Sequence, residues 1–456
     1  MTAFAIRGVN EGFYGPPWTH DQRLRMVGLL GAWSMTDFLV APKDDPWHRL
    51  HWREPFTEDQ LARLGELVGA GNAKGVRIGV ALGPGLTIRY SDPHECSALV
   101  ARVAQLRSVG VGLVALLLDD IPPMLQHEAD RFAYADVVDA HLDLVSRFRA
   151  GVRELDSLLP IAVCPLVYRG TGDEEYIVRF GHGLADDVAL MWTGRQICSE
   201  TLTTADAGAF AESTTHRPLY WDNYPVNDVA MTYELHIGPL RGRSSDLGAH
   251  CEGLLANPMP AFAASLLPLH TIAAYLRDPV NYDADAAWLA AVEEFVDDPD
   301  DRVAFINFGR CVQDSCLNAD AMPDIEPILM EAAFLWRTER LGQAVTALGE
   351  LARVIASASA RLTDPEFCNR SLQAGVAPWV AKYAKGGRAL ATMAGVIAGA
   401  DSRPRVEGQP DAGPAGIERL RAALAALQDD RHRVFGDGLE MTLAELIEEY
   451  EWVSGR

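Results

Sequence analysis

Two adjacent carboxylates, Asp119 and Asp120, follow an uncharged apolar stretch over residues 111–118. Such a run without proline is typical of a strand that is buried on both faces, as in a parallel sheet. In a (β/α)8 barrel the active site lies at the carboxyl ends of the strands. Two acids placed there can differ in environment, so that one is ionised while the other holds a proton. The ordinary alternative is that the pair caps the next helix.

Polar and aromatic residues also follow the other predicted strands. Together they supply carboxylates, amides, a lysine and aromatic rings, which are the components of a sugar pocket. The polar groups bind hydroxyls, and the rings cover the apolar face of the sugar. We therefore predict that one mouth of the fold binds a sugar. The stretches concerned are 11–15, 43–45, Tyr168, Trp192, 221–223, 227–228 and Asn257.

Strand and helix patterns alternate from the N-terminus to about residue 275, which predicts an α/β fold. A series of eight right-handed β/α units closes a (β/α)8 TIM barrel. The stretch 7–15, with three glycines, is expected to be a loop after the first strand. The predicted strands cover residues 4–6, 37–40, 76–82, 111–118, 160–164, 188–191, 218–221 and 253–256.

The strand signal disappears after about residue 280, and apolar residues then recur at three- and four-residue spacing. We therefore predict a catalytic barrel over residues 1–280 and an all-α helical bundle domain over residues 281–456. A stretch rich in proline and glycine, 400–416, is expected to be a loop between helices. Helices are predicted at 286–297, 323–338, 340–361, 369–398 and 415–428.

The composition of the chain argues against several classes of function. The chain has 456 residues and a net charge of −23, with a sequence pI near 4.9. This charge argues against nucleic-acid partners and against anionic membranes, because both attract basic surfaces. The sequence shows neither a signal peptide nor an apolar stretch of transmembrane length. Its seven cysteines are scattered and odd in number, which favours reduced thiols in a cytoplasmic protein.

Other catalytic and metal motifs are poorly matched. The sequence contains no Gly-x-Ser-x-Gly nucleophile motif and no Gly-x-x-x-x-Gly-Lys phosphate loop. His48 and His51 form an isolated His-x-x-His, for which we expect surface or structural roles. Residues 281–285 imitate the start of a calcium loop, but the glycine and glutamate that such a loop needs are missing. We therefore expect no cofactor and no metal.

Several motifs resemble glycoside hydrolase family 84, the β-N-acetylglucosaminidases that include O-GlcNAcase. They occur in the family's order over roughly the first 280 residues. The resemblance implies a (β/α)8 barrel and hydrolysis of N-acetylglucosaminides. The motifs are Arg-Gly-Val-Asn-Glu-Gly-Phe-Tyr-Gly-Pro-Pro-Trp (7–18), Ala-Pro-Lys-Asp-Asp-Pro-Trp-His-Arg (41–49), Trp-Arg-Glu-Pro-Phe (52–56), Asp-Asp-Ile (119–121), Met-Trp-Thr-Gly (191–194), Trp-Asp-Asn-Tyr-Pro-Val-Asn-Asp (221–228) and Asn-Pro-Met (257–259).

The resemblance also implies substrate-assisted, retaining hydrolysis, a known exception to the scheme with an enzymic nucleophile. The acetamido oxygen of the sugar would attack its own anomeric carbon and form an oxazoline. Asp119 would stay ionised and orient the acetamido N–H group. Asp120 would act first as general acid and then as the base that activates water.

The same resemblance implies substrate-binding roles for a further group of residues. The sugar hydroxyls would be bound by Gly12, Lys43, Asp228 and Asn257. The acetamido group would be contacted by Tyr168, Trp221 and Asn223. The pocket wall would be formed by Phe13 and Tyr14. Asn223 would also support Asp119. One departure concerns Cys164-Pro165-Leu166-Val167-Tyr168, where relatives often read Cys-Pro-Thr-Glu-Tyr. The Thr-Glu pair is lost, so any support that this glutamate gives to Tyr168 is missing.

The leading prediction is an exo-acting β-N-acetylglucosaminidase whose partner is a GlcNAc-containing glycoside or glycoprotein. One alternative is an endo-acting hexosaminidase that cleaves hyaluronan-like polymers, for which an open cleft is needed. Another is a GlcNAc-binding module without turnover, although both carboxylates and Lys43 are present. The apolar helical domain makes a homodimer a possible assembly.

Overall fold

Strand β4, Leu113–Leu117, precedes the two carboxylates, and all of its residues are buried. In the computed structural model, which describes residues 4–313, 315–317, 325–338, 340–401, 414–436 and 438–454, β4 belongs to a closed barrel of eight parallel strands in chain order. The predicted (β/α)8 barrel is confirmed. The other strands are β1 (Ile6–Glu11), β2 (Asp37–Val40), β3 (Arg77–Leu82), β5 (Ile161–Cys164), β6 (Val188–Trp192), β7 (Pro218–Asp222) and β8 (Gly253–Ala256).

The predicted position of the first strand was wrong. Strand β1 runs to Glu11, so the first part of the expected loop is strand. A Cβ atom at Gly8 would collide with the Asp37 carbonyl oxygen and with the Leu255 side chain, which belong to the two flanking strands. Gly8 therefore permits close approach of backbones inside a strand and does not form a turn.

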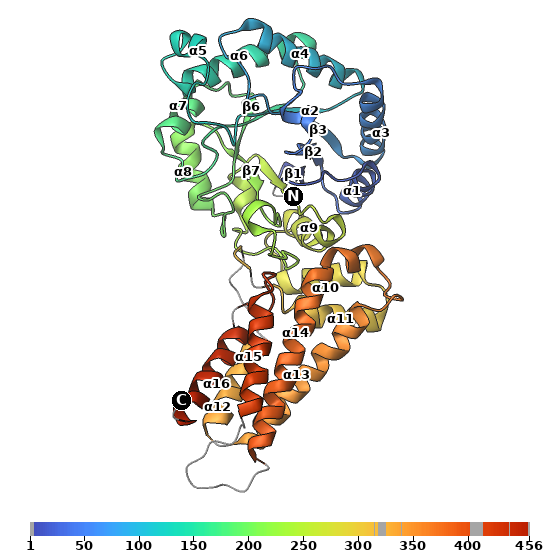
Figure 1. Ribbon diagram of the computed structural model, residues 1–456. Helices are drawn as coiled ribbons and strands as arrows, with labels where there is room; N and C mark the ends of the chain where they lie inside the picture. Colours follow the sequence, from blue (N-terminus) through green and yellow to red (C-terminus); the bar gives the residue numbers. More distant parts are fainter. Residues whose placement is uncertain are drawn as a thin grey trace. The chain divides into compact units, whose positions relative to one another are not determined.

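Helices surround the barrel (Figure 1). Helices α1 and α3 begin with capping boxes at Thr19 and Thr57. The helices of this part are α1 (His20–Ala32), α2 (Pro46–Arg49), α3 (Glu58–Lys74), α4 (Pro93–Ser108), α5 (Glu128–Ala133), α6 (Val137–Leu155), α7 (Glu175–Gly183), α8 (Thr204–Thr214) and α9 (Phe262–Arg277), with 3₁₀ turns η1 (Val229–Met231) and η2 (Leu247–Ala249).

The barrel interior is filled by alternate residues of the strands, as the two-residue period of a strand requires. In β4 these inward residues are Leu113, Ala115 and Leu117. They pack with small and apolar side chains from the neighbouring strands. The other members are Leu39, Ala41, Ala81, Ala162, Cys164, Met191, Leu219, Trp221 and Leu255.

The chain divides into two compact units. The first comprises Met1–Val229, Pro239–Ser265 and Leu269–Ala287, and the second Ala230–Gly238, Leu266–Pro268 and Trp288–Arg456. The predicted domain limit at residue 280 stays a prediction. None of the helices in the part of the chain that the structure describes is both long and apolar enough to cross a membrane.

The chain after the barrel is helical in its described residues, as predicted. Helix α13 packs along α14 (Figure 1). Helices α11 and α16 had not been predicted. Residues 323–324 of one predicted helix and most of the predicted loop at 400–416 lie outside the described residues. The helices are α10 (Ala284–Phe295), α11 (Pro299–Gly309), α12 (Glu326–Arg337), α13 (Leu341–Leu362), α14 (Arg370–Asp401), α15 (Pro414–Gln428) and α16 (Gly438–Ser454).

Candidate active site

The predicted site residues continue the inward alternation of the barrel strands beyond the strand ends. Leu117 faces the interior, and Asp119 follows two positions later. The same two-residue step leads from Ala41 to Lys43. It also leads from Trp221 to Asn223 and from Leu255 to Asn257. The strand period that fills the core therefore also brings polar groups to the barrel mouth.

Asp119 has two carboxylate oxygens in different situations. Its Oδ2 atom lies 2.5 Å from the Nζ atom of Lys43, and the two side chains are only 7% and 4% exposed. Its Oδ1 atom is buried and has no hydrogen-bond partner among the described residues. A buried acceptor without a donor costs free energy, so this oxygen is suited to receive an N–H or O–H group from a ligand.

Lys43 is the positive centre of the site. Its Nζ atom also lies 3.9 Å from Asp120 and 5.3 Å from the ring centroid of Trp221. Burial alone would lower the pKa of Lys43, but the carboxylates of Asp119 and Asp120 outweigh it and raise this pKa. The ammonium therefore stays charged at neutral pH and can both pair with Asp119 and meet a sugar hydroxyl.

Asp120 is exposed and is held by two tyrosine hydroxyls. Tyr14 donates to its Oδ2 atom at 2.8 Å, and Tyr168 donates to its Oδ1 atom at 3.0 Å. The backbone of Asp120 has a φ of 53°, in the left-handed region that aspartate tolerates better than most residues. This turn explains how the side chains of two adjacent residues both lie near Lys43. Burial and the nearby Asp120 carboxylate raise the pKa of Tyr168 well above its ordinary value, so its hydroxyl keeps its proton.

Arg49 is a residue of the site that the sequence analysis did not single out. It lies at the end of α2, where its Nη1 atom donates to the hydroxyl of Tyr14 and its Nη2 atom to the backbone carbonyl of Asp120, both at 3.0 Å. Arg49 therefore fixes both Asp120 and one of the two tyrosines that hold it. The signal was present, because Arg49 closes the motif at 41–49.

A second hydrogen-bonded group links the residues that follow β7 and β8 to the loop after β1. The side chain of Asn257 accepts from the backbone N–H of Gly12 at 3.1 Å and donates to Asn223 at 2.9 Å. Asn223 also accepts from the indole N–H of Trp221 at 2.9 Å and donates to the carbonyl of Ile197. These bonds fix the indole ring, and among the described residues they do not include the expected contact between Asn223 and Asp119.

Asp228 and Phe13 take different positions at the loop after β1. The Oδ2 atom of Asp228 accepts from the backbone N–H of Tyr14 at 2.6 Å, and burial raises the pKa of Asp228. Asp228 is therefore joined to the loop that carries Tyr14. Phe13 is fully buried and its ring lies 5.8 Å from that of Trp18, so Phe13 supports the loop from the core side.

Asn10 is a second residue that the sequence analysis missed. It lies on β1 at an inward position, two residues before Gly12. Its side chain is fully buried, and neither its Oδ1 nor its Nδ2 atom has a hydrogen-bond partner among the described residues. Such a side chain needs an ordered water or a ligand group to satisfy it.

Two ion pairs with buried carboxylates anchor the strand ends that carry the site. At the end of β1, Arg23 lies 2.7 Å from Glu11. At the end of β7, Arg243 lies 2.6 Å from Asp222, and both side chains are at most 4% exposed. Because removing one member would leave a buried charge unpaired, these pairs constrain the two strand ends strongly.

Known proteins resemble this chain in sequence and in structure. A family profile described as beta-N-acetylglucosaminidase matches residues 7–309. The curated proteins named Protein O-GlcNAcase from Rattus norvegicus and Mus musculus are each 30% identical over 280 residues, which is 60% of this chain and 30% of theirs. The chain thus spans well under half the length of these relatives.

A solved structure matches almost the whole chain. It is an aspartate-to-asparagine mutant of the O-GlcNAc hydrolase from Thermobaculum terrenum, with a TM-score of 0.92 and 30% sequence identity. The match covers 99% of this chain and 96% of that one. The likeness therefore includes both the barrel and the helical part that follows it.

Proposed function

Because this chain belongs to the beta-N-acetylglucosaminidase family of glycoside hydrolases, we propose that it removes terminal β-linked N-acetylglucosamine from a glycoside or a glycoprotein. The proposed enzyme is exo-acting and retaining. It resembles the O-GlcNAcases, and the resemblance to family 84 found in the motifs is confirmed. The proposed reaction uses the acetamido group of the substrate as the nucleophile.

The observation that carries this proposal is the unequal state of the two oxygens of Asp119. One oxygen is bound by Lys43, and the other is buried without a donor. An acetamido N–H would supply that donor. As the acetamido oxygen attacks the anomeric carbon, positive charge develops on the nitrogen, and the Asp119 carboxylate stabilises it. The product of this step is an oxazoline, and no enzyme side chain forms a covalent bond.

Asp120 would move the proton in both steps. In the first step its carboxylic acid protonates the leaving oxygen, and in the second its carboxylate takes a proton from the attacking water. A tyrosine hydroxyl can donate to a carboxylate or accept from a carboxylic acid. Tyr14 and Tyr168 can therefore hold Asp120 in place in both of its protonation states.

The remaining site residues would bind the sugar itself. Lys43, Asp228, Asn257 and the backbone of Gly12 are proposed to meet the hydroxyls. Trp221 and Tyr168 are proposed to surround the acetamido methyl group, with Asn223 fixing the Trp221 ring. Tyr14 is proposed for the pocket wall, and Phe13 for its support.

The nucleophile can be tested with aryl N-acetylglucosaminides whose acetamido methyl carries increasing numbers of fluorine atoms. If the acetamido oxygen attacks, kcat/KM falls steeply with each fluorine, because the oxygen becomes less nucleophilic. A thiazoline analogue of the oxazoline should inhibit competitively. A flat fluorine series together with indifference to the thiazoline would overturn the proposed mechanism while leaving glycosidase activity possible.

The roles of the two carboxylates are separated by comparing Asp119→Asn with Asp120→Asn. Loss of the general acid should affect an aryl glycoside with a poor leaving group far more than one with a good leaving group. Loss of Asp119 should affect both alike. Equal losses on both substrates for Asp120→Asn would contradict its role as the acid.

Product analysis distinguishes the two alternatives. An endo-acting hexosaminidase would release oligosaccharides from hyaluronan-like polymers, whereas the proposed enzyme releases only the monosaccharide from a GlcNAc-modified peptide. A binding module would bind N-acetylglucosamine without hydrolysing an aryl glycoside. The ion pair of Lys43 with Asp119 favours catalysis, because it places the charged groups that the reaction needs in a buried site.

We also propose a cytoplasmic location and keep the homodimer as a prediction. The seven cysteines, all within the described residues, form no disulfide, which fits a reducing compartment. Fractionation of the native source tests the location. Sedimentation velocity at several protein concentrations tests the assembly, and a single concentration-independent monomer would contradict the dimer.

A further inference from the structure

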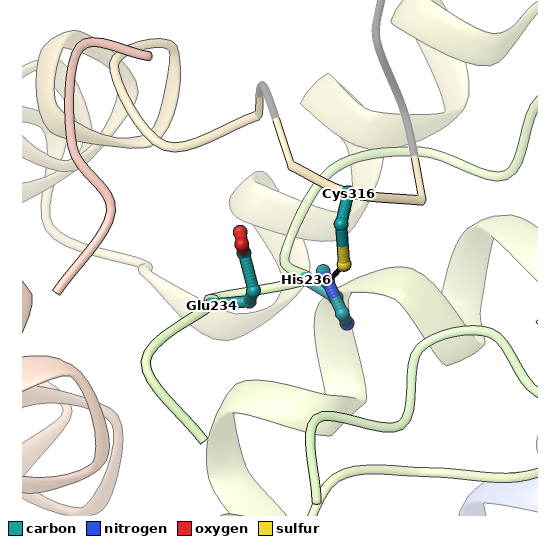
Figure 2. A group of neighbouring side chains, drawn as sticks. All are labelled: Glu234, His236 and Cys316. Atoms are coloured by element: carbon teal, nitrogen blue, oxygen red, sulfur yellow. Dashed lines mark hydrogen bonds between the residues drawn. The ribbon is translucent and has the colours of Figure 1, made fainter. Parts of the chain in front are cut away.

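Three side chains that can bind metal lie close together in the second unit, and none of them belongs to the proposed sugar site. Glu234 and His236 lie in the segment that follows η1, and Cys316 lies in the segment that follows α11. Figure 2 shows Cys316 pointing toward His236 from a different stretch of chain, with Glu234 on the same stretch as His236. No metal was expected from the sequence; Cys316 is separated from His236 by 80 residues, so the three residues form no local ligand motif.

The geometry is close to that of a metal site. One ligand atom from each residue lies within 4.8 Å of the other two, and the Sγ atom of Cys316 is 4.0 Å from the Nε2 atom of His236. Tetrahedral zinc with bonds of about 2.3 Å to sulfur and 2.0–2.1 Å to nitrogen holds these two atoms about 3.5 Å apart. The observed separation exceeds this value by about half an ångström, which a rotation of the exposed Cys316 side chain can supply.

The donor set selects the metal. A thiolate, an imidazole and a carboxylate are ligands of zinc, whereas magnesium and calcium prefer oxygen alone. The ionised forms of Cys316 and Glu234 together balance the charge of a divalent cation. Binding would release the thiol proton of Cys316 to solvent. We propose that Glu234, His236 and Cys316 bind one Zn²⁺ ion, with water as the fourth ligand.

The residues around the three ligands indicate that the ion would have a structural role. His236 is only 2% exposed, so its ring is already held in place. Arg433 lies 3.9 Å from one oxygen of Glu234, so this carboxylate can reach a metal through one oxygen and the arginine through the other. The ion would join two segments that are separated by about 80 residues, and it would therefore stabilise the second unit. The proposed reaction of Asp119 and Asp120 assigns no step to this ion.

The binding test uses the full chain after treatment with a chelator and a reductant. Zinc is titrated against a chromogenic chelator, and cobalt is added as a spectroscopic probe. We expect about one zinc per chain, and thiolate-to-cobalt charge-transfer absorption. Cys316→Ser should abolish that absorption and should lower the zinc affinity by more than the roughly 10- to 100-fold that loss of an outer hydrogen-bond partner costs. Glu234→Gln and His236→Gln should also lower the affinity.

Cys368→Ser is the matched control, because Cys368 is another exposed cysteine of the second unit. It should bind zinc like the unchanged protein. Alkylation provides a readout that does not require a variant to fold. Zinc should slow the labelling of Cys316 by iodoacetamide and should leave the labelling of Cys368 unchanged.

The competing explanation is an ordinary thiol–imidazole hydrogen bond between Cys316 and His236. In that case zinc would not protect Cys316 from alkylation, and Cys316→Ser would bind as much zinc as the unchanged chain. Either result overturns the proposal. Hydrolysis of an aryl N-acetylglucosaminide should be unaffected by Cys316→Ser, so failure of the metal site is distinguishable from failure of the proposed function.

Discussion

Asp120 is positioned by side chains from three different segments of the chain. Tyr14 follows β1, Arg49 ends α2, and Tyr168 follows β5. A general acid must lie within hydrogen-bond reach of the leaving oxygen, so small shifts of its carboxylate change the rate. The three contacts are therefore the places where single substitutions should affect proton transfer most directly.

Tyr168→Phe removes one of the two hydroxyls that hold Asp120. A hydrogen bond to a charged group contributes about 1.5–3 kcal/mol, so kcat should fall roughly 10- to 100-fold. The loss should be larger for a poor leaving group than for a good one, which a series of aryl glycosides measures.

Tyr220→Phe is the control for the loss of a phenolic hydroxyl. The Tyr220 hydroxyl is buried, on the face of β7 opposite to that of Leu219 and Trp221, and has no hydrogen-bond partner among the described residues. Its removal should leave kcat unchanged and should preserve or raise the free energy of unfolding. Equal kinetic losses in the two variants would contradict the role given to Tyr168.

Arg49→Met tests whether this arginine positions the acid. The variant loses the donors to Tyr14 and to the Asp120 carbonyl, so kcat should fall about 10-fold or more while KM changes little. Arg49→Lys should recover part of the loss. The control is Arg63→Met, because Arg63 is 62% exposed on α3. A rise in KM alone would show that Arg49 binds substrate and does not position Asp120.

The residue types of the site were predictable, but their contacts were only partly so. Asp119, Lys43 and Trp221 were found because polar and aromatic residues follow predicted strands. Arg49 was missed because an arginine in a polar stretch of sequence is ordinarily interpreted as a surface charge. Asn10 was missed because its stretch was expected to be a loop, and the inward position of Asn10 follows only from the strand.

At the scale of elements, the junction of β1 with its loop is the most constrained part of the site. A Cβ atom at Gly12 would overlap the Trp221 ring, over which the Lys43 ammonium lies. Gly12→Ala should therefore displace the ring and lower kcat/KM about 100-fold, the loss typical of a displacement near 1 Å. The assay is hydrolysis of an aryl N-acetylglucosaminide.

A second glycine-to-alanine substitution serves as the control for the general effect of adding a Cβ atom. A Cβ atom at Gly28, in α1, would meet no atom within 4 Å. Gly28→Ala should therefore keep its activity and should raise the free energy of unfolding by about 0.5–1 kcal/mol. If Gly12→Ala retained full activity, the Trp221 ring would not be the rigid wall that the structure indicates.

Strand and helix positions followed from the sequence where the apolar period was regular. Strand β8 was predicted with its observed limits, and β4 within two residues at its start. The predicted position of β1 was wrong because Gly8 suggested a loop. A glycine is required at this position by a close backbone contact between strands. Helix α11 was missed because Val303, Ile306 and its two phenylalanines are β-branched or aromatic and do not favour helix in isolation.

At the scale of the whole molecule, buried histidines should make stability depend on pH. Burial lowers the pKa of His48 and of His141 to about 3. Below the ordinary pKa of about 6.5 the unfolded chain gains protons that the folded chain does not. Each histidine should therefore lower the free energy of unfolding by about 1.4 kcal/mol per pH unit as the pH falls from 6.5 toward 3.

His141→Gln isolates one of these contributions. His141 is bonded to the hydroxyls of Tyr90 and Tyr176, so the variant should be less stable at pH 7.5. Its stability should nevertheless fall less steeply than that of the unchanged chain between pH 6 and pH 4, as denaturant titrations at several pH values would measure. An identical slope for His141→Gln would show that this ring is protonated in the folded state.

If the proposed function holds, the buried oxygen of Asp119 that lacks a hydrogen-bond donor would also select among sugars. A 2-deoxy sugar offers it no donor, and a 2-hydroxyl sugar offers a donor but no internal nucleophile. Sites built around a buried polar group reject analogues that leave it unpaired by about 10⁴–10⁵. Discrimination against unacetylated sugars would then arise from the same oxygen that stabilises the transition state. Selectivity and rate acceleration would be inseparable properties of one carboxylate, so no substitution of Asp119 should broaden the substrate range without losing turnover.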